Sequence, residues 1–419
     1  MRLLALLLLA TAVLACGPLT STSAPGTVAD ESGPTVRVVI AAGVRRVALT
    51  ASDGWQIADD GGASTLVRAA PGDAWTVEAP QGGLMRAVRA DGVPTAMRPG
   101  PFVARPLARD AMLSVGGKRY RGEVRIIPTD SGLVVVNHLP LEAYLRGVVP
   151  LEIGRRSPGE EAAVEAQAVA ARSYAYTRLS RDERARWDLR ATEMDQVYGG
   201  ADAETPFSDA AVERTRGLVL TYAGRVVSAP YHSNCGGTTA APDEVWNEGS
   251  DAPYLQRVSD RIPGTDRYYC DIFPRFRWTR TFDAAALTAV LDRYLRAYAA
   301  VPARGVGRVR SAAVEGTTPS GRARALVVTT DRGSWRLRGN EMRFVLRSAG
   351  GEILPSTYLT AETERGGSGA LARLVLRGTG NGHGIGMCQW GAIGRARAGQ
   401  DAREILRTYY PGTSVAAME

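Results

Sequence analysis

The chain has 419 residues, of which 45% are hydrophobic and 22% are charged, so it can bury the cores of two to three domains. The formal net charge of +8 is modest. No run of five basic residues interleaved with aromatic residues occurs in the sequence, which argues against nucleic acid as a partner.

The N-terminus has the pattern of a bacterial export signal over residues 1–16. A basic start precedes an apolar run from Leu3 to Leu14, which is too short to span a bilayer. Cys16 follows this run in a stretch that resembles a lipobox, so we expect lipidation of Cys16; a simple signal peptide is the alternative. Residues 17–35 predict a flexible tether, rich in Ser, Thr, Pro and Gly. The expected product is an exported, membrane-anchored lipoprotein that faces the periplasm or cell wall.

Residues 36–124 predict a β-rich accessory region. Stretches such as "GWQIAD" and "STLVRAAPGDAWTVEAP" alternate apolar and polar residues with period two and are separated by Gly and Pro. Neither a nucleophile nor a metal-ligand cluster stands out in this part of the sequence.

The next stretch predicts a strand and two helices. The first helix is expected over about Leu141 to Val148 and leads to Glu152. Ser157, with Pro158 at the first helical position and Glu160 three residues on, has the pattern of a capping box. The long, Ala-rich helix expected to follow has a face of small residues, which predicts a buried central position.

Four later stretches complete a mixed pattern. "GLVLTYAGRVVSAPYHSNCGG" predicts a hairpin that ends in a polar, Gly-rich loop. "TFDAAALTAVLDRYLRAYA" predicts an amphipathic helix capped by Thr281 or Asp283, and "VVTTDRGSWRLRGNEMRFVL" predicts a hairpin and a short helix. "AIGRARAGQDAREILRTYYPGT" predicts one or two helices. Because strands and helices do not alternate regularly, the expected fold class is α+β.

Three cysteines follow Cys16, namely Cys235, Cys270 and Cys388. An odd number in an oxidising compartment allows one pair or none. A disulfide between Cys235 and Cys270 would stabilise the fold by about 3–4 kcal/mol. His232 precedes Cys235 at a ligand-like spacing, so a zinc site of His232, Cys235 and Cys270 is the alternative to no metal at all.

The ordered motifs from about residue 125 to the C-terminus resemble the SpoIID/LytB family, named for stage II sporulation protein D and an amidase enhancer. The resemblance implies a SpoIID-like mixed domain over residues 125–419 and does not cover residues 36–124. The matching stretches are "LPLEAYLRGVVPLEIG", "EAAVEAQAVAARSYAY", "DQVYGG", "YHSNCGGTT", "VW" with "YLQRV", and "GHGIGMCQWGAIGRA" with "ILRTYYPGT".

The resemblance implies a peptidoglycan lytic transglycosylase that cleaves the MurNAc-GlcNAc backbone, especially of strands without stem peptides. The catalytic acid of the family falls on Glu152, where this chain continues with Ile-Gly in place of the frequent Met-Pro. A carboxyl group protonates a glycosidic oxygen near neutral pH only if desolvation raises its pKa, and Glu152 has apolar neighbours. Among the competing carboxylates, we expect Glu142 to favour a helix start, Glu165 to be solvated and Asp195 to begin a loop.

Three loops are predicted to bind the glycan. Gln196 and Tyr198 could donate hydrogen bonds to sugar groups, and His232 and Ser233 lie where the family has a polar loop. For Gln196 and Tyr198 the alternative is a turn or core role, and for His232 it is the zinc site or a free side chain beside a disulfide.

The Gly-rich stretch "GNGHGIGMCQWGAIG" is predicted to expose His383, Gln389 and Trp390 beside Glu152. The family usually has Ser at Cys388, which argues against a Cys–His nucleophile, and no Lys follows the glycines as in a phosphate-binding loop. A tight core turn is the alternative.

Three functions remain open at this point. The first is the lytic transglycosylase, the second is a non-catalytic wall-binding amidase enhancer, and the third is a zinc- or cysteine-dependent wall hydrolase. The expected partners are peptidoglycan glycan strands, a wall amidase or other wall hydrolase, and the membrane through the lipid anchor. No cofactor is required by the first two.

Overall fold

The computed structural model describes residues 33–418 except residues 63, 82, 183, 247–251 and 368–369. The predicted signal peptide, Cys16 and nearly all of the predicted tether lie outside the described residues. Thr35, the last residue of the predicted tether, already begins the first strand. Within the described part of the chain, no helix is both long and apolar enough to cross a membrane.

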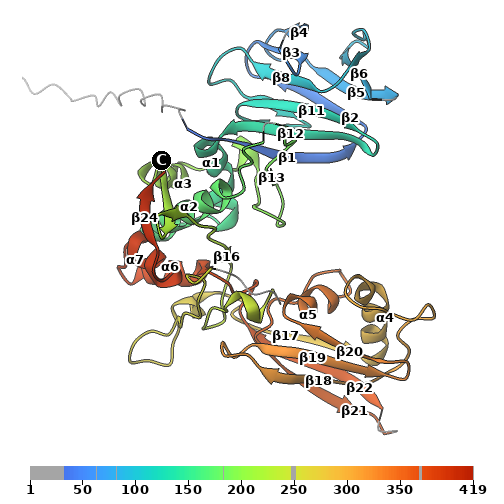
Figure 1. Cartoon of the computed structure of the whole chain (residues 1–419), viewed down its shortest axis with the longest axis vertical. Coiled ribbons are helices and arrows are strands. Elements are labelled where there is room, and N and C mark those ends of the chain that lie inside the picture. Colours follow the sequence, from blue (N-terminus) through green and yellow to red (C-terminus); the bar gives the residue numbers. More distant parts are fainter. Residues whose placement is uncertain are drawn as a thin grey trace, which may run out of the picture. The chain divides into compact units, whose positions relative to one another are not determined.

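The alternating N-terminal stretches form two sheets, as expected (Figure 1). Alternate strand residues face one side, and the inward residues of both sheets, such as Trp55 and Val77, are fully buried in one core. The larger sheet has the order β13 (Leu189–Arg190), β1 (Thr35–Val44), β12 (Gly132–Pro140), β11 (Glu123–Thr129), β8 (Phe102–Pro106), β3 (Trp55–Asp59) and β4 (Thr65–Ala69). The smaller sheet has the order β10 (Lys118–Tyr120), β9 (Leu113–Val115), β2 (Arg46–Ala51), β5 (Trp75–Gln81), β6 (Leu84–Arg89) and β7 (Arg98–Pro99).

The sheets and the following helices share this core. The boundary expected between residues 124 and 125 falls inside β11, and β12 pairs with β1 on one side and β11 on the other. β12 then leads directly into α1 (Leu141–Glu152), whose buried residues belong to the same core as those of the sheets. The β-rich region therefore supports the first helix through their common core.

The predicted central helix is α2 (Glu161–Tyr176), and its alanines are buried. Small side chains let neighbouring elements approach closely. α2 contacts α1 and β14 as well as α3 (Pro206–Arg214), α6 (Gln389–Arg397) and α7 (Ala402–Tyr409). The predicted hairpin is formed by β14 (Leu218–Tyr222) and β15 (Arg225–Val226), and β24 (Ser414–Ala417) pairs with β14.

The predicted start of α2 at Ser157 is wrong. Gly159 has φ of +90°, which is outside the helical region and prevents a helix from beginning at Pro158. The Glu160 carboxylate accepts a bond from the Ser157 N–H at 3.1 Å, and its other oxygen accepts from the guanidinium of Arg397 at 2.9 Å. The capping-box residues therefore form a turn, and the helix begins at Glu161.

A second core, which the sequence did not indicate, is formed by elements between Arg277 and Thr379. Asp283 caps α4 by accepting a hydrogen bond from the Ala286 N–H at 2.7 Å, as one of the two predicted caps. Two sheets, with the orders β17-β22-β21 and β18-β19-β20, build this part. The elements are β17 (Arg277–Asp283), α4 (Ala284–Tyr294), β18 (Val309–Thr317), β19 (Ala323–Thr330), β20 (Ser334–Arg338), α5 (Asn340–Val345), β21 (Leu359–Arg365) and β22 (Leu371–Thr379).

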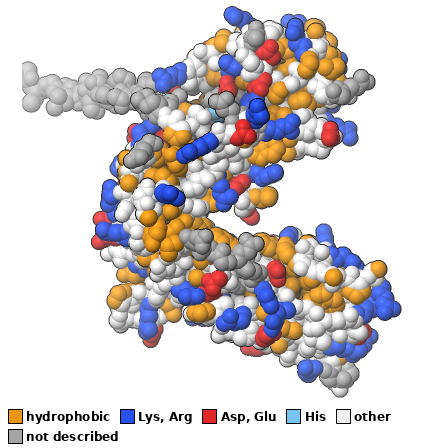
Figure 2. Space-filling view, in the orientation of Figure 1, with side chains coloured by type: hydrophobic (Ala, Val, Ile, Leu, Met, Phe, Trp, Pro, Cys, Tyr) orange, Lys and Arg blue, Asp and Glu red, His pale blue; other side chains and the backbone are white. Residues whose placement is uncertain are grey.

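Charged side chains of both signs are interspersed on the face seen in Figure 2. Many arginines pair with carboxylates, as Arg86 does with Glu78 at 2.7 Å. This distribution agrees with the absence of a basic nucleic-acid motif from the sequence.

We predict that Glu142→Ala destabilises the protein much more than Glu165→Ala. Both carboxylates pair with arginines, but Arg172, the partner of Glu142, is fully buried, with bonds of 2.8 and 2.7 Å. An unpaired buried charge costs about 3–5 kcal/mol. Arg214, the partner of Glu165, is 49% exposed, and loss of such a pair costs about 1 kcal/mol or less. Urea unfolding of both variants measures the difference, and equal losses would contradict the structure.

Candidate active site around Glu152

Glu152 is the last residue of α1, which is one turn longer than expected. Pro150 lies in the last turn, Ile153 is the C-cap and Gly154 follows with φ of +77°. A glycine in this conformation just after the C-cap is a common helix terminator. The Ile-Gly that replaces Met-Pro after the acid therefore ends the helix at Glu152.

The carboxyl group of Glu152 is half-buried, and burial raises its pKa to about 7. The backbone N–H of Val197 donates to Oε1 at 2.7 Å and works against this shift, while the nearby charge of Glu193 adds to it. The carbonyl end of α1 also disfavours a carboxylate. A carboxyl group with this pKa can give up and regain a proton near neutral pH.

Gln196 and Tyr198 flank Val197 in the same loop, and their side chains point into the protein. Gln196 is fully buried; it accepts a hydrogen bond from the Tyr144 hydroxyl at 3.1 Å and donates to the Tyr231 hydroxyl at 2.9 Å. The buried Tyr198 donates to Asn137 at 2.8 Å. Both residues predicted to contact substrate are therefore buried in the protein. Their hydrogen bonds hold the loop in which Val197 donates to Glu152.

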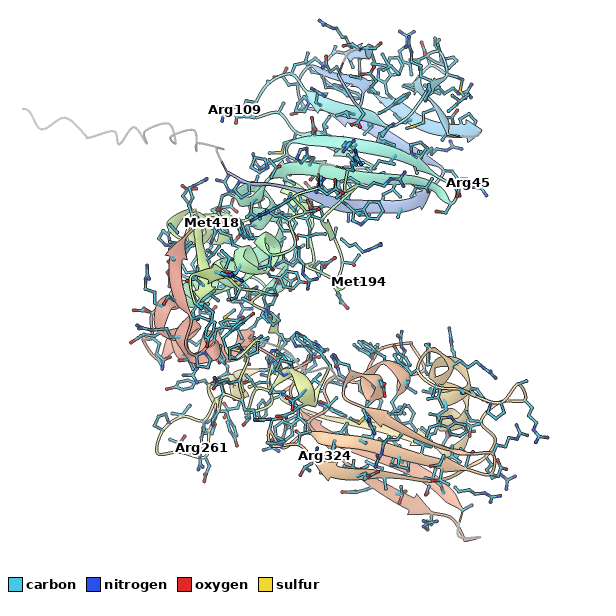
Figure 3. All side chains as sticks on the ribbon, in the orientation of Figure 1. Arg45, Arg109, Met194, Arg261, Arg324 and Met418 are labelled. Carbon is cyan, nitrogen blue, oxygen red and sulfur yellow. The ribbon has the colours of Figure 1, made fainter. Side chains whose placement is uncertain are left out.

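The surface of the same loop is partly apolar. Met194 is 76% exposed and its side chain points away from the ribbon (Figure 3), and Leu151, beside Glu152, is 45% exposed. Asp195, by contrast, accepts hydrogen bonds from the Tyr174 hydroxyl and the Arg190 N–H, one on each carboxylate oxygen. Asp195 therefore holds the loop.

Tyr231 connects the Gly-rich stretch to this loop. Nε2 of His383 lies 2.8 Å from the Tyr231 carbonyl, and Nδ1 accepts from the Ile385 N–H at 3.1 Å. This pattern places the proton of His383 on Nε2. Burial, and to a smaller extent the charge of the neighbouring His232, holds the pKa of His383 well below its usual value, so the ring is neutral. The hydroxyl of the same Tyr231 meets Gln196, next to the Val197 that binds Glu152.

Trp246 is a site residue that the sequence analysis did not select. Its ring centroid lies 5.8 Å from that of His383, and the side chain is 40% exposed. The "VW" motif contains Trp246 and was the signal available for it. An exposed indole beside a histidine is a surface on which a sugar ring can pack.

The other residues predicted to contact the glycan differ in how far they are buried. Gln389 is buried and donates to Gln167 of α2 at 3.2 Å, and His232 is buried with Nδ1 near the Ile385 carbonyl. Trp390 is half-buried between the Phe273 ring and the Arg156 guanidinium, at 5.3 and 5.2 Å.

Ser233 is also half-buried, and its carbonyl accepts a hydrogen bond from the Trp390 N–H at 3.1 Å. Of the seven predicted binding residues, Ser233, His383 and Trp390 thus keep some exposure. The structure brings His383 toward the Glu152 loop through Tyr231, while Gln389 and Trp390 brace α6 against its neighbours.

Comparison with known proteins identifies a matching family and several relatives. Residues 129–222, which include Glu152, match the SpoIID family, described as stage II sporulation protein. An uncharacterised protein of Brachyspira hyodysenteriae is 31% identical over 72% of this chain and 73% of its own length. The amidase enhancer of Bacillus subtilis is 32% identical over 72% of this chain but 45% of its own length. Stage II sporulation protein D of Bacillus subtilis is 29% identical over 67% of this chain and 75% of its own length.

The chain belongs to the SpoIID/LytB family. A second match covers residues 263–386 and is to a domain of unknown function, DUF8618. In this SpoIID/LytB protein, Glu152 and His383 therefore come from two separately matched segments. All the buried residues of the second core lie within the DUF8618 match.

Within the described part of this SpoIID/LytB protein, the cysteines Cys235, Cys270 and Cys388 are free, buried thiols. The ligand atoms of Cys235, Cys270, Cys388 and Asp260 lie within 4.8 Å of one another. This group contains two members of the zinc set that the sequence offered as an alternative to no metal, adds Cys388 and Asp260, and does not contain His232. A disulfide between Cys235 and Cys270 is not formed in the structure.

We predict that Glu152→Gln stabilises the protein at pH 8 and leaves its stability nearly unchanged at pH 4. The folded-state pKa of about 7 lies above the ordinary value of 4.5, so the stability that the protonated carboxyl contributes is present below pH 4.5 and is lost as the pH rises through about 7. The gain at pH 8 is at most about 3 kcal/mol. Denaturant unfolding at both pH values measures it; the same difference at both would show that the pKa is not raised.

Proposed function

We propose that this protein is an exported cell-wall enzyme, a lytic transglycosylase that cleaves the MurNAc-GlcNAc backbone of peptidoglycan with Glu152 as general acid and base. The observation that carries the proposal is the half-buried Glu152 carboxyl, whose pKa of about 7 suits proton transfer in both directions. Family membership supports a role at the cell wall, and the amidase-enhancer and sporulation relatives agree with it. Lipidation of Cys16 would hold the enzyme near its polymer.

The proposed reaction needs one carboxyl group. Protonated Glu152 gives its proton to the glycosidic oxygen as the bond from C1 of the muramic acid breaks. The 6-hydroxyl of the same sugar then forms a bond to C1, and the Glu152 carboxylate takes the hydroxyl proton. The products are a free GlcNAc 4-hydroxyl and a 1,6-anhydro sugar, and no water is consumed. Asp195 is engaged within the protein, which agrees with a mechanism without a second carboxylate.

The surroundings of Glu152 support binding of a polymer of sugar rings. Leu151, Met194 and Trp246 are three of the large apolar side chains that the protein leaves exposed, and each lies beside a residue of the candidate site. An exposed apolar side chain beside a polar site residue gives a sugar ring a face to pack against. The neutral His383 next to Trp246 adds a hydrogen-bonding ring to this surface.

We predict that the purified mature protein releases 1,6-anhydro-muramyl products from glycan strands without stem peptides. Glu152→Gln lowers the rate about 10²- to 10⁴-fold because it removes the transferable proton. In the wild type, kcat/KM falls as the pH rises above about 7, since the free enzyme must be protonated. Chromatography with mass spectrometry identifies the products.

The matched control is Glu165→Gln, which changes an α2 carboxylate paired with Arg214 and keeps the activity. If the wild type binds the strands and yields no anhydro products, the catalytic proposal fails and a wall-binding amidase enhancer replaces it. Reducing-end products with added water would indicate hydrolysis instead.

We predict that Trp246→Ala weakens binding of the same strands about tenfold, because stacking on an aromatic ring is lost. Tyr298→Ala is the control, since Tyr298 is similarly exposed at 43% but stacks on Phe344 of α5. Equal losses in both variants, measured by co-sedimentation or calorimetry, would show that Trp246 has no special role.

A further inference from the structure

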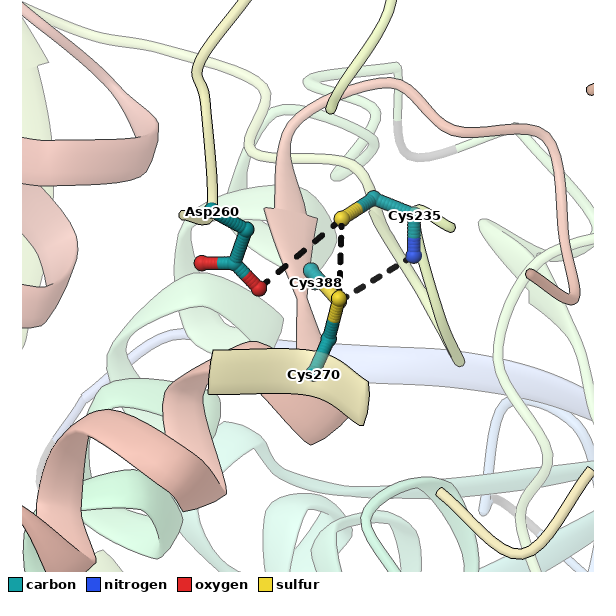
Figure 4. A group of neighbouring side chains, drawn as sticks. All are labelled: Cys235, Asp260, Cys270 and Cys388. Carbon is teal, nitrogen blue, oxygen red and sulfur yellow. Dashed lines mark hydrogen bonds between the residues drawn. The ribbon is translucent and has the colours of Figure 1, made fainter. Parts of the chain in front are cut away.

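Three distant segments bring three cysteines and a carboxylate together in the core (Figure 4). Cys235 follows β16 (Tyr231–His232), Cys270 lies in the short helix η3 (Tyr269–Ile272) and Cys388 ends β23 (Met387–Cys388). β16 and β23 pair in parallel, which places Cys388 opposite His232. All three thiols and Asp260 are buried.

The four ligand atoms lie close enough together to surround one metal ion. Sγ of Cys235 lies 3.6 Å from Sγ of Cys270 and 3.9 Å from Oδ2 of Asp260, and all four atoms lie within 4.8 Å of one another. Thiolates at the usual zinc–sulfur distance of about 2.3 Å lie about 3.8 Å apart at the corners of a tetrahedron. A disulfide between Cys235 and Cys270 would remove the Cys235 thiol that donates to Oδ2 of the buried Asp260 and would leave this oxygen without that donor.

The groups around these atoms hold them in place for a ligand. Oδ1 of Asp260 accepts hydrogen bonds from Arg395, at 3.0 Å, and from the Tyr409 hydroxyl, at 2.7 Å, so that Oδ2 faces the sulfurs. Sγ of Cys388 accepts bonds from the backbone N–H groups of Cys235 and Gly391, at 3.2 and 3.3 Å. Such outer contacts orient metal ligands, and N–H donors stabilise a thiolate.

The buried charges agree with a dianionic metal site. Arg322 is fully buried and donates to the Cys235 carbonyl at 2.8 Å, and its Nε and Nη1 have no hydrogen-bond partner among the described residues. A buried guanidinium without compensation is costly. Three thiolates, one carboxylate and a divalent ion carry a net charge of −2, which Arg322 and Arg395 balance.

We propose that Cys235, Cys270, Cys388 and Asp260 hold a structural Zn²⁺ ion. The set of four buried protein ligands leaves no open position, which is typical of structural and not of catalytic zinc. Sulfur-rich tetrahedral coordination favours zinc over harder cations. The ion ties β16, η3 and β23 together, and β16 carries the Tyr231 that reaches the Glu152 loop.

The first test is the metal content and thiol state of the wild-type full-length chain, prepared under reducing conditions with Zn²⁺ and without chelator. We expect inductively coupled plasma mass spectrometry to find one zinc ion per chain. The intact mass of the protein is expected to show no disulfide. Replacement by Co²⁺ is expected to give the intense sulfur-to-metal charge-transfer absorption of thiolate ligands. A folded chain without bound metal, or one with a Cys235–Cys270 disulfide, overturns the proposal, and neither result depends on a variant.

Single variants then test the ligands. Cys388→Ser and Asp260→Asn are expected to lower the zinc content at least tenfold after dialysis, whereas Cys16→Ser, the chain's one further cysteine, keeps it. Glu152→Gln is expected to keep the full zinc content as well, which separates this proposal from the catalytic one. If zinc remains in Cys388→Ser at the wild-type level, the assigned ligand set is wrong.

Discussion

The site depends on a carboxyl group that is buried enough to keep its proton and exposed enough to exchange it. α1 achieves this by ending at Glu152, where the Val197 N–H of a neighbouring loop is the one backbone donor that the structure gives the carboxyl. Two further contacts fix the helix that carries it. β12 leads into its first turn, and the Glu142 carboxylate holds the buried Arg172 of α2. The sheets and α2 therefore serve as the rigid support for the proposed proton transfer.

Tyr231 gives the second half of the site its place. Its hydroxyl belongs to the buried group under the Glu152 loop, while its carbonyl fixes the tautomer of His383. The two ends of one residue thus couple segments that are more than 150 residues apart in the chain. Trp246 and His383 extend the site outward from this residue.

Elements with strong local signals were predictable from the sequence. The Ala-rich α2, the cap of α4 by Asp283 and the α+β class follow from periodicity and short-range capping, and the family follows from ordered motifs. Nonlocal contacts decided the rest. The Arg397 guanidinium and the conformation of Gly159 moved the start of α2, and the burial of Gln196 depends on a tyrosine from another segment. The four-residue cysteine and aspartate group was hidden for the same reason, since its members span most of the C-terminal half.

The antiparallel pairing of β17 with β22 brings the two ends of the second core side by side, at Arg277 and Thr379. The chain thus leaves the rest of the protein and returns to it through one paired stem, and the Gly380 N–H closes that stem on the Phe276 carbonyl. A segment attached in this way adds little loop-closure entropy to the folding of its host. The acid and its support therefore lie outside the stem, and the length of the module does not enter the path of the chain through α1 and α2.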